Sequence, residues 1–140
     1  MIPVYAQEHD FSSCRVLAVD DIPLNLVLVK KILSRFNFQM ETASGGQEAL
    51  DSIARSKPDL ILLDLMMPGI DGFEVIRRLR ANPDTADIRI VILTALTSGE
   101  DVSKGFNMGA NDYIMKPIIM ERLLTSVVTQ LSMVQSAKAQ

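Results

Sequence analysis

Four short apolar runs, each followed at once by a polar or charged residue, constrain the fold of this chain more than any other feature. The runs are residues 15–19 before Asp20, 60–63 before Asp64, 90–93 before Thr94 and 113–115 before Lys116. Short runs of branched apolar residues are typical of strands buried on both faces, as in a parallel sheet. The carboxyl ends of such strands share one edge, where open α/β sheets place their sites. With Asp21 included, we expect three carboxylates, one hydroxyl and one ammonium group to converge there.

Helical periodicity alternates with the apolar runs. Strands are expected at 15–19, 38–42, 60–63, 88–93 and 112–115, with helices beginning near Pro23, Ser44, Asp71, Ser98 and Pro117. Ser44 and Gln47 fit a capping box, and the strand at 38–42 alternates apolar and polar residues as edge strands do. Right-handed crossovers place helices on both faces of the sheet. The pattern predicts an α/β domain with a doubly wound, flavodoxin-like (βα)5 sheet in the order 2-1-3-4-5, which makes the first and third strands neighbours.

Composition limits both the domain count and the function classes. The 140 residues are 48% hydrophobic and carry a net charge of -3, which favours one globular domain and gives no basic footprint for nucleic acid. We expect a flexible leader at 1–13, the domain at 14–134 with its last helix ending at Val134, and a polar tail at 135–140. One cysteine and one histidine argue against a zinc site and fit a reducing compartment. No targeting signal or membrane span is visible, so the cytoplasm is the expected location.

Four motifs at the strand ends identify a family. They are Val19-Asp20-Asp21, Asp64 to Gly72 with its Met67-Pro68-Gly69 turn, Leu93-Thr94-Ala95, and Gly109-Ala110 leading through Tyr113 to Lys116-Pro117. In this order they resemble the receiver domain of bacterial two-component response regulators over roughly residues 14–131. The resemblance implies a signalling switch, not a turnover enzyme, that takes a phosphoryl group from a histidine kinase or a histidine phosphotransfer protein.

Carried over by motif, the resemblance implies a phosphoacceptor and a metal site. Asp64 would be the acceptor. Asp20, Asp21 and Asp64, with the backbone carbonyl of Met66, would hold Mg²⁺ or Mn²⁺ in its place, with Asp20 acting partly through water. Clustered carboxylates repel one another, and Mg²⁺ prefers oxygen ligands while keeping several waters, so this donor set suits it. A simpler interpretation of the Asp20-Asp21 pair is a cap on the helix that follows.

The resemblance also implies a phosphate-sensing group. Thr94 would donate its hydroxyl to a phosphoryl oxygen and Lys116 would supply a point charge. The Lys116-Pro117 bond would be cis, an isomer almost confined to bonds before proline. Tyr113 would be the aromatic switch that turns inward on phosphorylation, although a half-exposed residue on an edge strand is the plainer alternative.

Two apolar residues lead to a hypothesis about the lifetime of the phosphate. Met66 and Leu96 follow Asp64 and Thr94 by two residues, at positions that flank the path of attacking water in the family. Neither side chain can orient a water molecule, which predicts slow self-dephosphorylation. The output surface is expected to comprise the fourth helix, fifth strand and fifth helix. Of these, the fourth helix, expected at 98–108, has only a thin apolar face and is a candidate for mobility.

Other interpretations remain open at this point. An aspartyl-phosphate hydrolase of the haloacid dehalogenase type also uses Asp, Thr, Lys and Mg²⁺. It would require a second acid where Met66 stands, and a nucleophile on the first strand. A nucleotide-binding module would need a glycine-rich phosphate loop, which the sequence lacks. A phosphorylation-independent interaction module would not need the complete acidic set. The output protein or effector domain is unknown, and the chain could be a monomer or a phosphorylation-dependent dimer.

Overall fold

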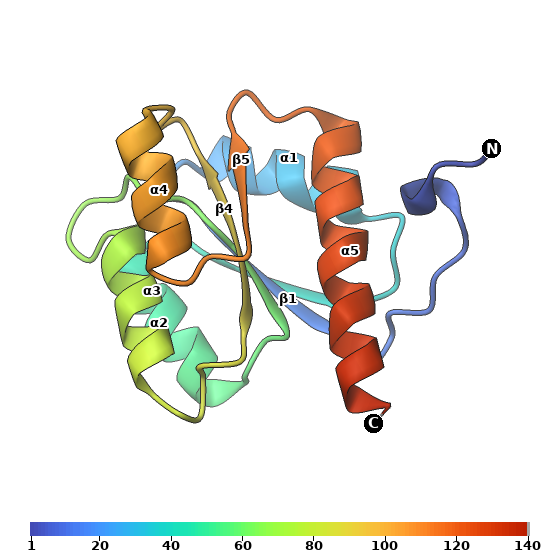
Figure 1. The fold of residues 1–140 in the computed structure, drawn as a ribbon, viewed down its shortest axis with the longest axis horizontal. Helices are drawn as coiled ribbons and strands as arrows, with labels where there is room; N and C mark the ends of the chain where they lie inside the picture. Colours follow the sequence, from blue (N-terminus) through green and yellow to red (C-terminus); the bar gives the residue numbers. More distant parts are fainter. Residues whose placement is uncertain (140) are drawn as a thin grey trace.

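The computed structural model describes residues 1–139, which form one five-stranded parallel sheet covered by helices on both faces (Figure 1). The strands are β1 (Arg15–Val19), β2 (Gln39–Ala43), β3 (Leu60–Leu63), β4 (Arg89–Thr94) and β5 (Asp112–Met115). They are hydrogen-bonded in the order β2-β1-β3-β4-β5, and all four pairs are parallel. The predicted flavodoxin-like topology is therefore confirmed, with β1 next to β3.

Five α-helices and one short 3-10 helix complete the fold. They are η1 (Val4–Ala6), α1 (Pro23–Leu33), α2 (Gly46–Arg55), α3 (Gly72–Ala81), α4 (Gly99–Asn107) and α5 (Met120–Lys138). Figure 1 shows α1 and α5 on one face of the sheet and α2, α3 and α4 on the other. Each face has its own apolar core, one containing Leu123 and Leu124 of α5 and the other Val75 and Ile76 of α3. Among residues 1–139, no helix has both the length and the apolar composition needed to cross a bilayer.

Burial explains why the central strands could be found from the sequence. All four residues of β3 are buried, because its strand neighbours lie on both sides and helices cover both faces. In contrast, β2 at the sheet edge buries only Ala43, which agrees with its alternating sequence. The expected second and fourth strands were each placed one residue too early, since β2 begins at Gln39 and β4 at Arg89. The ends of the first, third and fifth strands were correctly located, whereas Thr94 is the last residue of β4 and not the residue after it.

Local hydrogen bonds decide where the helices begin. The Asp71 carboxylate accepts from the Glu74 N–H at 2.9 Å and caps α3, and the Ser98 hydroxyl caps α4. The capping box predicted for α2 is wrong in detail. Gly45 occupies the cap position, and the Ser44 hydroxyl donates to the carboxylate of Glu48 at 2.6 Å instead of pairing with Gln47.

The two ends of the domain differ from the boundaries expected from the sequence. Phe11 is fully buried and stacks against His9, and its backbone N–H donates to the Asn37 side chain at 2.7 Å. The packed domain therefore starts before residue 14, because Phe11 is part of the core and Tyr5 packs against it. At the other end, α5 begins at Met120, not at Pro117, and continues beyond Val134 to Lys138. This takes in most of the expected tail, while residue 140 lies outside the described residues.

The last two helices differ sharply in how much they bury. In α4 the one buried residue is Gly105, which confirms the thin apolar face expected of this helix. In α5 seven residues are buried, from Leu123 to Leu131. A helix held by so few buried side chains has less packing energy opposing its displacement than α5 has.

Candidate functional site

The sheet order brings two acidic residues to neighbouring strand ends. Asp20 follows β1 and Asp64 follows β3, and their backbone N–H groups extend the sheet by bonding to the carbonyls of Ala43 and Val19 at 3.1 and 3.0 Å. Both side chains are buried. Together with Asp21 they form a cluster whose nearest carboxylate oxygens all lie within 4.8 Å of one another. The three acids predicted to converge therefore do so.

A glycine allows the chain to pass close beneath Asp64. A Cβ atom on Gly72 would lie 2.3 Å from the backbone oxygen of Asp64, so only glycine fits where α3 starts. The Gly72 N–H also donates to the carbonyl of Leu65 at 3.1 Å. The turn after β3 is thereby drawn against the strand end, which limits how far the Asp64 backbone can move.

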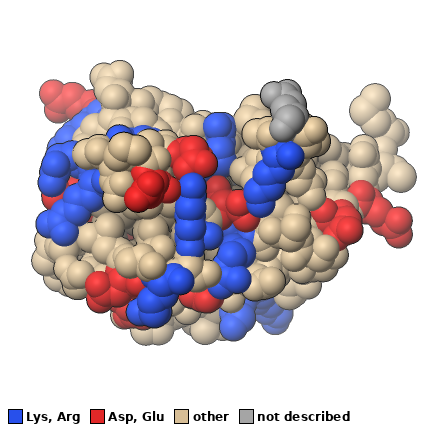
Figure 2. Space-filling model, turned by 90° about the horizontal axis from the view of Figure 1, so that it is seen from below, with Lys and Arg blue, Asp and Glu red and all other residues tan. Residues whose placement is uncertain are grey.

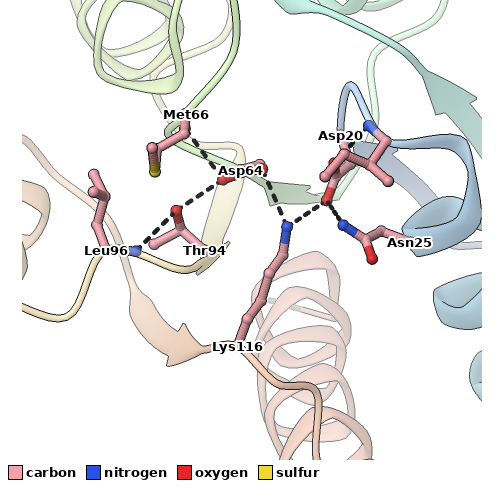
Figure 3. A network of polar contacts seen from close by, with 8 residues as sticks. Asp20, Asn25, Asp64, Met66, Thr94, Leu96 and Lys116 are labelled. Atoms are coloured by element: carbon pink, nitrogen blue, oxygen red, sulfur yellow. Dashed lines mark hydrogen bonds and ion pairs between the residues drawn. The ribbon is translucent and has the colours of Figure 1, made fainter.

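Lys116 reaches the acidic cluster from the end of β5. Its Nζ donates to Asp20 Oδ2 at 2.7 Å and to Asp64 Oδ2 at 3.1 Å, and so bridges the two buried acids (Figure 3). The Lys116-Pro117 bond is cis, as the resemblance implied. Burial would lower the pKa of Lys116. The hydrogen bonds that it donates to Asp20 and Asp64, together with the negative charges of these carboxylates, outweigh that effect and raise the pKa. The ammonium group is therefore held in its charged form between two carboxylates.

The second oxygen of Asp64 faces the end of β4. The Thr94 hydroxyl donates to Asp64 Oδ1 at 2.8 Å, and the Met66 N–H donates to the same oxygen at 3.1 Å (Figure 3). Thr94 is completely buried, whereas the side chain of Met66 is 55% exposed at the rim. Both oxygens of Asp64 are thus oriented by donors from three different segments of the chain.

Asp20 is held by groups at the start of α1. Its Oδ1 accepts from the Ile22 N–H at 2.9 Å and its Oδ2 accepts from the Asn25 side chain at 3.1 Å. The simpler interpretation, a carboxylate cap on α1, is only partly right. Asp20 accepts from the Ile22 N–H, but the cap position itself is occupied by Ile22 and not by an aspartate. Asn25 was missed, since one amide in a helical first turn carries no distinctive signal.

The donor set fits a divalent oxygen-loving cation. Three carboxylates meet one ammonium group, which leaves two negative charges unbalanced among the cluster residues. Carboxylates are hard oxygen ligands, and Mg²⁺ needs only a few of them because it retains water. Asp21, which is not buried, gives such an ion a route in from solvent. The cluster is therefore suited to Mg²⁺ on the chemistry of its donors.

A short chain of contacts connects this site to β5. The Leu96 N–H lies 3.5 Å from the Thr94 hydroxyl, and the Leu96 carbonyl accepts from the Tyr113 hydroxyl at 2.8 Å. Tyr113 is buried, so the alternative of a half-exposed edge residue is wrong. Burial, followed by the negative charges of Asp101 and Asp64, raises the pKa of Tyr113.

Gly105 of α4 provides the room for the Tyr113 ring. A Cβ atom at Gly105 would lie 3.3 Å from Cδ2 of that ring and 2.7 Å from Cδ1 of Ile92. The glycine that gives α4 its thin apolar face therefore also admits Tyr113 beneath the helix. The helix expected at 98–108 contains Gly105, but its role could not be found from the sequence, because the contact forms only when β5 lies beside β4.

Comparisons with known proteins agree with this geometry. The family model described as response regulator receiver domain matches residues 16–128. Response regulator PleD of Caulobacter vibrioides is 45% identical over 106 residues, which cover 76% of this chain and 23% of PleD. Response regulator MprA of Mycobacterium leprae is 42% identical over 113 residues, covering 81% of this chain and 49% of MprA. The chain therefore spans half or less of the length of these curated relatives.

Solved structures match over nearly their whole length. The chemotaxis protein CheY4 of Vibrio cholerae is 33% identical with a TM-score of 0.76, and the match covers 81% of this chain and 95% of that one. A receiver domain protein of Methanospirillum hungatei is 27% identical with a TM-score of 0.81, covering 89% of this chain and 98% of that one. The matched range contains all of the strand-end residues described above. The chain belongs to the response regulator receiver domain family of two-component signalling.

Proposed function

We propose that Asp64 accepts a phosphoryl group in a reaction that requires Mg²⁺, or Mn²⁺ in its place. The arrangement of Asp64 is the observation that supports this most. One carboxylate oxygen is held by Thr94 and the Met66 N–H, and the other by Lys116. Asp20, Asp21 and Asp64, with the carbonyl of Met66, would hold the metal ion. A bound Mg²⁺ would supply the positive charge that offsets the carboxylates and the incoming phosphoryl oxygens.

The chemistry follows from what these side chains can donate. An Asp64 oxygen attacks phosphorus, the bond between phosphorus and the donor's imidazole nitrogen breaks, and that nitrogen keeps the electron pair. The product is an acyl phosphate on Asp64. Lys116 and Thr94 already donate to the Asp64 oxygens, and they would donate to phosphoryl oxygens once these arrive. Such transfer depends mainly on positioning and charge stabilisation, which this site provides.

The proposed donor is a histidine kinase or a histidine phosphotransfer protein, as the family implies. In this proposal the domain is a signalling switch that promotes its own phosphorylation and dephosphorylation. The output protein or effector domain, and the choice between a monomer and a phosphorylation-dependent dimer, remain open. The cytoplasmic location and the absence of a direct nucleic-acid partner stay predictions.

The proposed switch passes from Thr94 through Leu96 to Tyr113. When the Thr94 hydroxyl turns to a phosphoryl oxygen, the Leu96 segment moves with it, and so does the acceptor of the Tyr113 hydroxyl. The α4-β5-α5 surface would then shift between two populated conformations. The small buried surface of α4 makes this helix the element that yields.

The proposal is tested by phosphorylation with a small acyl-phosphate or phosphoramidate donor, followed by intact mass. The wild-type chain should gain one phosphoryl group only when Mg²⁺ is present, and Asp64→Asn should gain none. Asp84→Asn is the matched control, because Asp84 is an exposed carboxylate outside the cluster. Uptake by Asp64→Asn, or uptake by the wild type without a divalent metal ion, would contradict the proposal. Donor turnover without an adduct would favour the hydrolase alternative.

The same adduct tests whether Met66 and Leu96 prolong the phosphate lifetime. The exposed Met66 side chain offers no group that orients water, so Met66→Asn should shorten the half-life of the adduct. Met133→Asn is the control, since Met133 is similarly exposed on α5. An unchanged half-life in Met66→Asn would leave the slow-dephosphorylation hypothesis without support.

A further inference from the structure

A large cavity lies at the opposite end of the sheet from the acidic cluster. It has a volume of about 760 Å³ and is lined by residues at the amino ends of β3 and β4, the end of α3, the α4-β5 connection and the last turns of α5. Figure 2 looks onto this end of the molecule and shows Lys and Arg side chains gathered across its middle, with carboxylates beside them. Cavities of roughly 300–1,000 Å³ are the usual size of small-molecule sites.

The charged lining of this cavity is mainly positive. It consists of Lys57, Arg80, Arg89 and Lys138, with Asp59 and Asp87 as its carboxylates. Lys57 pairs with Asp87 at 2.7 Å and Lys138 pairs with Asp59 at 3.0 Å. Within residues 1–139 neither arginine has a carboxylate partner, so the cavity carries two surplus positive charges in a chain of net charge -3.

Arg80 contributes a fixed charge at this surface. All of its N–H groups donate within the fold, to the carbonyls of Gly109, Ala86 and Ile88 and to the side chain of Asn111, at 2.7 to 3.1 Å. Burial, and then the positive charge of Arg89, lowers the pKa of Arg80, while Asp87 opposes the shift. The positive charge of Arg80 is therefore held in place by neutral partners and is not cancelled by them.

Arg89 and Asn111 retain donors that could reach a ligand. Arg89 donates from Nε to Gln130 at 2.8 Å and from Nη2 to the sulfur of Met133 at 3.3 Å, and its Nη1 makes no hydrogen bond with the described residues. The Asn111 oxygen accepts from Arg80 and from the Ile90 N–H, and its side-chain nitrogen has no partner in that part of the chain either. Both residues line the cavity.

We propose that this cavity binds a small phosphorylated ligand of the nucleotide class. The phosphate would accept from Arg89 and Asn111 beside the fixed charge of Arg80, because a guanidinium group suits phosphate oxygens. The ring of the ligand would pack on the apolar wall that Met133 and Val134 contribute. This site is separate from the proposed phosphoacceptor and does not depend on it.

The probes are adenosine monophosphate, guanosine monophosphate, adenosine and inorganic phosphate. Each is titrated into the full chain in Mg²⁺-free buffer, and backbone amide NMR shifts are followed. At least one nucleotide should give saturable shifts around Arg89 and Asn111, and should bind more tightly than adenosine or phosphate alone. Asp64→Asn should bind it equally well, since the acidic cluster is at the other end of the sheet.

Two variants change the charge of the cavity in opposite directions. Arg89→Gln should weaken nucleotide binding about tenfold, the effect of losing one charge-assisted contact. Asp87→Asn, at a well-exposed position, should strengthen binding about twofold by freeing Lys57. Arg55→Gln is the matched control, since Arg55 is exposed on α2 and does not line the cavity.

Several results would overturn the proposal. It fails if none of the four probes gives saturable shifts at the cavity, or if Arg89→Gln binds as tightly as the wild type. Should Arg89→Gln not fold, weaker binding by Asp87→Asn would overturn it in the same way. Equal affinity for inorganic phosphate and for both nucleotides would overturn the assignment to the nucleotide class.

Discussion

At the carboxyl end of the sheet, one ammonium group bridges two of three clustered carboxylates, whereas at the amino end one guanidinium group donates only to neutral acceptors. Lys116 bridges Asp20 and Asp64 and leaves the acidic cluster negatively charged. Arg80 donates a hydrogen bond from every N–H group, to three backbone carbonyls and one side-chain amide. The first end keeps a charge imbalance that a bound cation can relieve. At the second end, Arg80 holds segments of the chain together through neutral partners, so its contacts contribute mainly to stability.

Replacing Arg80 should have the largest effect on stability. Arg80→Met removes five donated hydrogen bonds and leaves partly buried carbonyls unsatisfied, so we expect a loss of about 3 kcal/mol in the free energy of unfolding. Urea unfolding measures it, and phosphoryl uptake by the folded fraction should persist. Arg78→Met is the control, because its exposed pair with Glu74 should contribute under about 1 kcal/mol. Equal losses of stability in the two variants would mean that the hydrogen bonds of Arg80 stabilise the amino end no more than an exposed ion pair does.

A smaller loss is expected where Arg80 meets the α4-β5 connection. Gly109 has φ of 112°, and a Cβ atom there would lie 2.8 Å from Nε of Arg80. Gly109→Ala should therefore lower the free energy of unfolding by about 2 kcal/mol. Gly99→Ala is the control, because nothing lies within 4 Å of its Cβ position. Thermal unfolding compares the two. An unchanged stability of Gly109→Ala would show that the α4-β5 connection adapts to the added Cβ atom without displacing Arg80.

Adding Mg²⁺ should stabilise the domain by binding at the carboxyl end of the sheet. At a concentration tenfold above its dissociation constant, Mg²⁺ should raise the free energy of unfolding by about 1.4 kcal/mol, because it binds only the folded cluster. Asp21→Asn should largely abolish this gain, whereas Asp84→Asn should retain it, as measured by thermal unfolding with and without the metal ion. Equal gains in both variants would place the metal ion outside the cluster.

The smallest effect is expected at the link between the site and β5. Tyr113→Phe removes the hydrogen bond to the Leu96 carbonyl and should lower the free energy of unfolding by about 1 kcal/mol. Tyr5→Phe is the control, since no hydrogen bond of the Tyr5 hydroxyl is found within residues 1–139. Both are measured by urea unfolding. Indistinguishable losses would mean that the Tyr113 hydroxyl contributes nothing to holding this link.

Much of the fold and the site could be predicted because their signals are local. The apolar run at 60–63 predicted β3 residue for residue, since complete burial demands an uninterrupted apolar sequence. Asp64 and Thr94 stand directly after such runs, so their convergence followed from the expected strand order. The leader was harder to interpret, because only packing against Asn37 and neighbouring aromatic rings shows that Phe11 belongs to the core.

Arg80 and Gly105 could not be identified from the sequence for the same physical reason. In the sequence Arg80 is one of three arginines in α3 and looks no different from the exposed Arg77 and Arg78. Two of its partners, Gly109 and Asn111, lie 29 and 31 residues away, in the α4-β5 connection. Gly105 likewise acquires its contacts with Ile92 and Tyr113 only when other segments lie beside α4.

The sequence by itself determined which segments become strands, in what order they lie and which polar residues stand at their carboxyl ends. Strand burial and turn chemistry act between near neighbours in the chain, and the order of the strands followed from the rules that govern crossovers in doubly wound sheets. Only the tertiary structure decided that Lys116 bridges Asp20 and Asp64, that Tyr113 lies beneath Gly105, and that the positive cavity forms around Arg89. Those contacts join side chains far apart in the sequence, and their distances are set by how the helices pack on the two faces of the sheet.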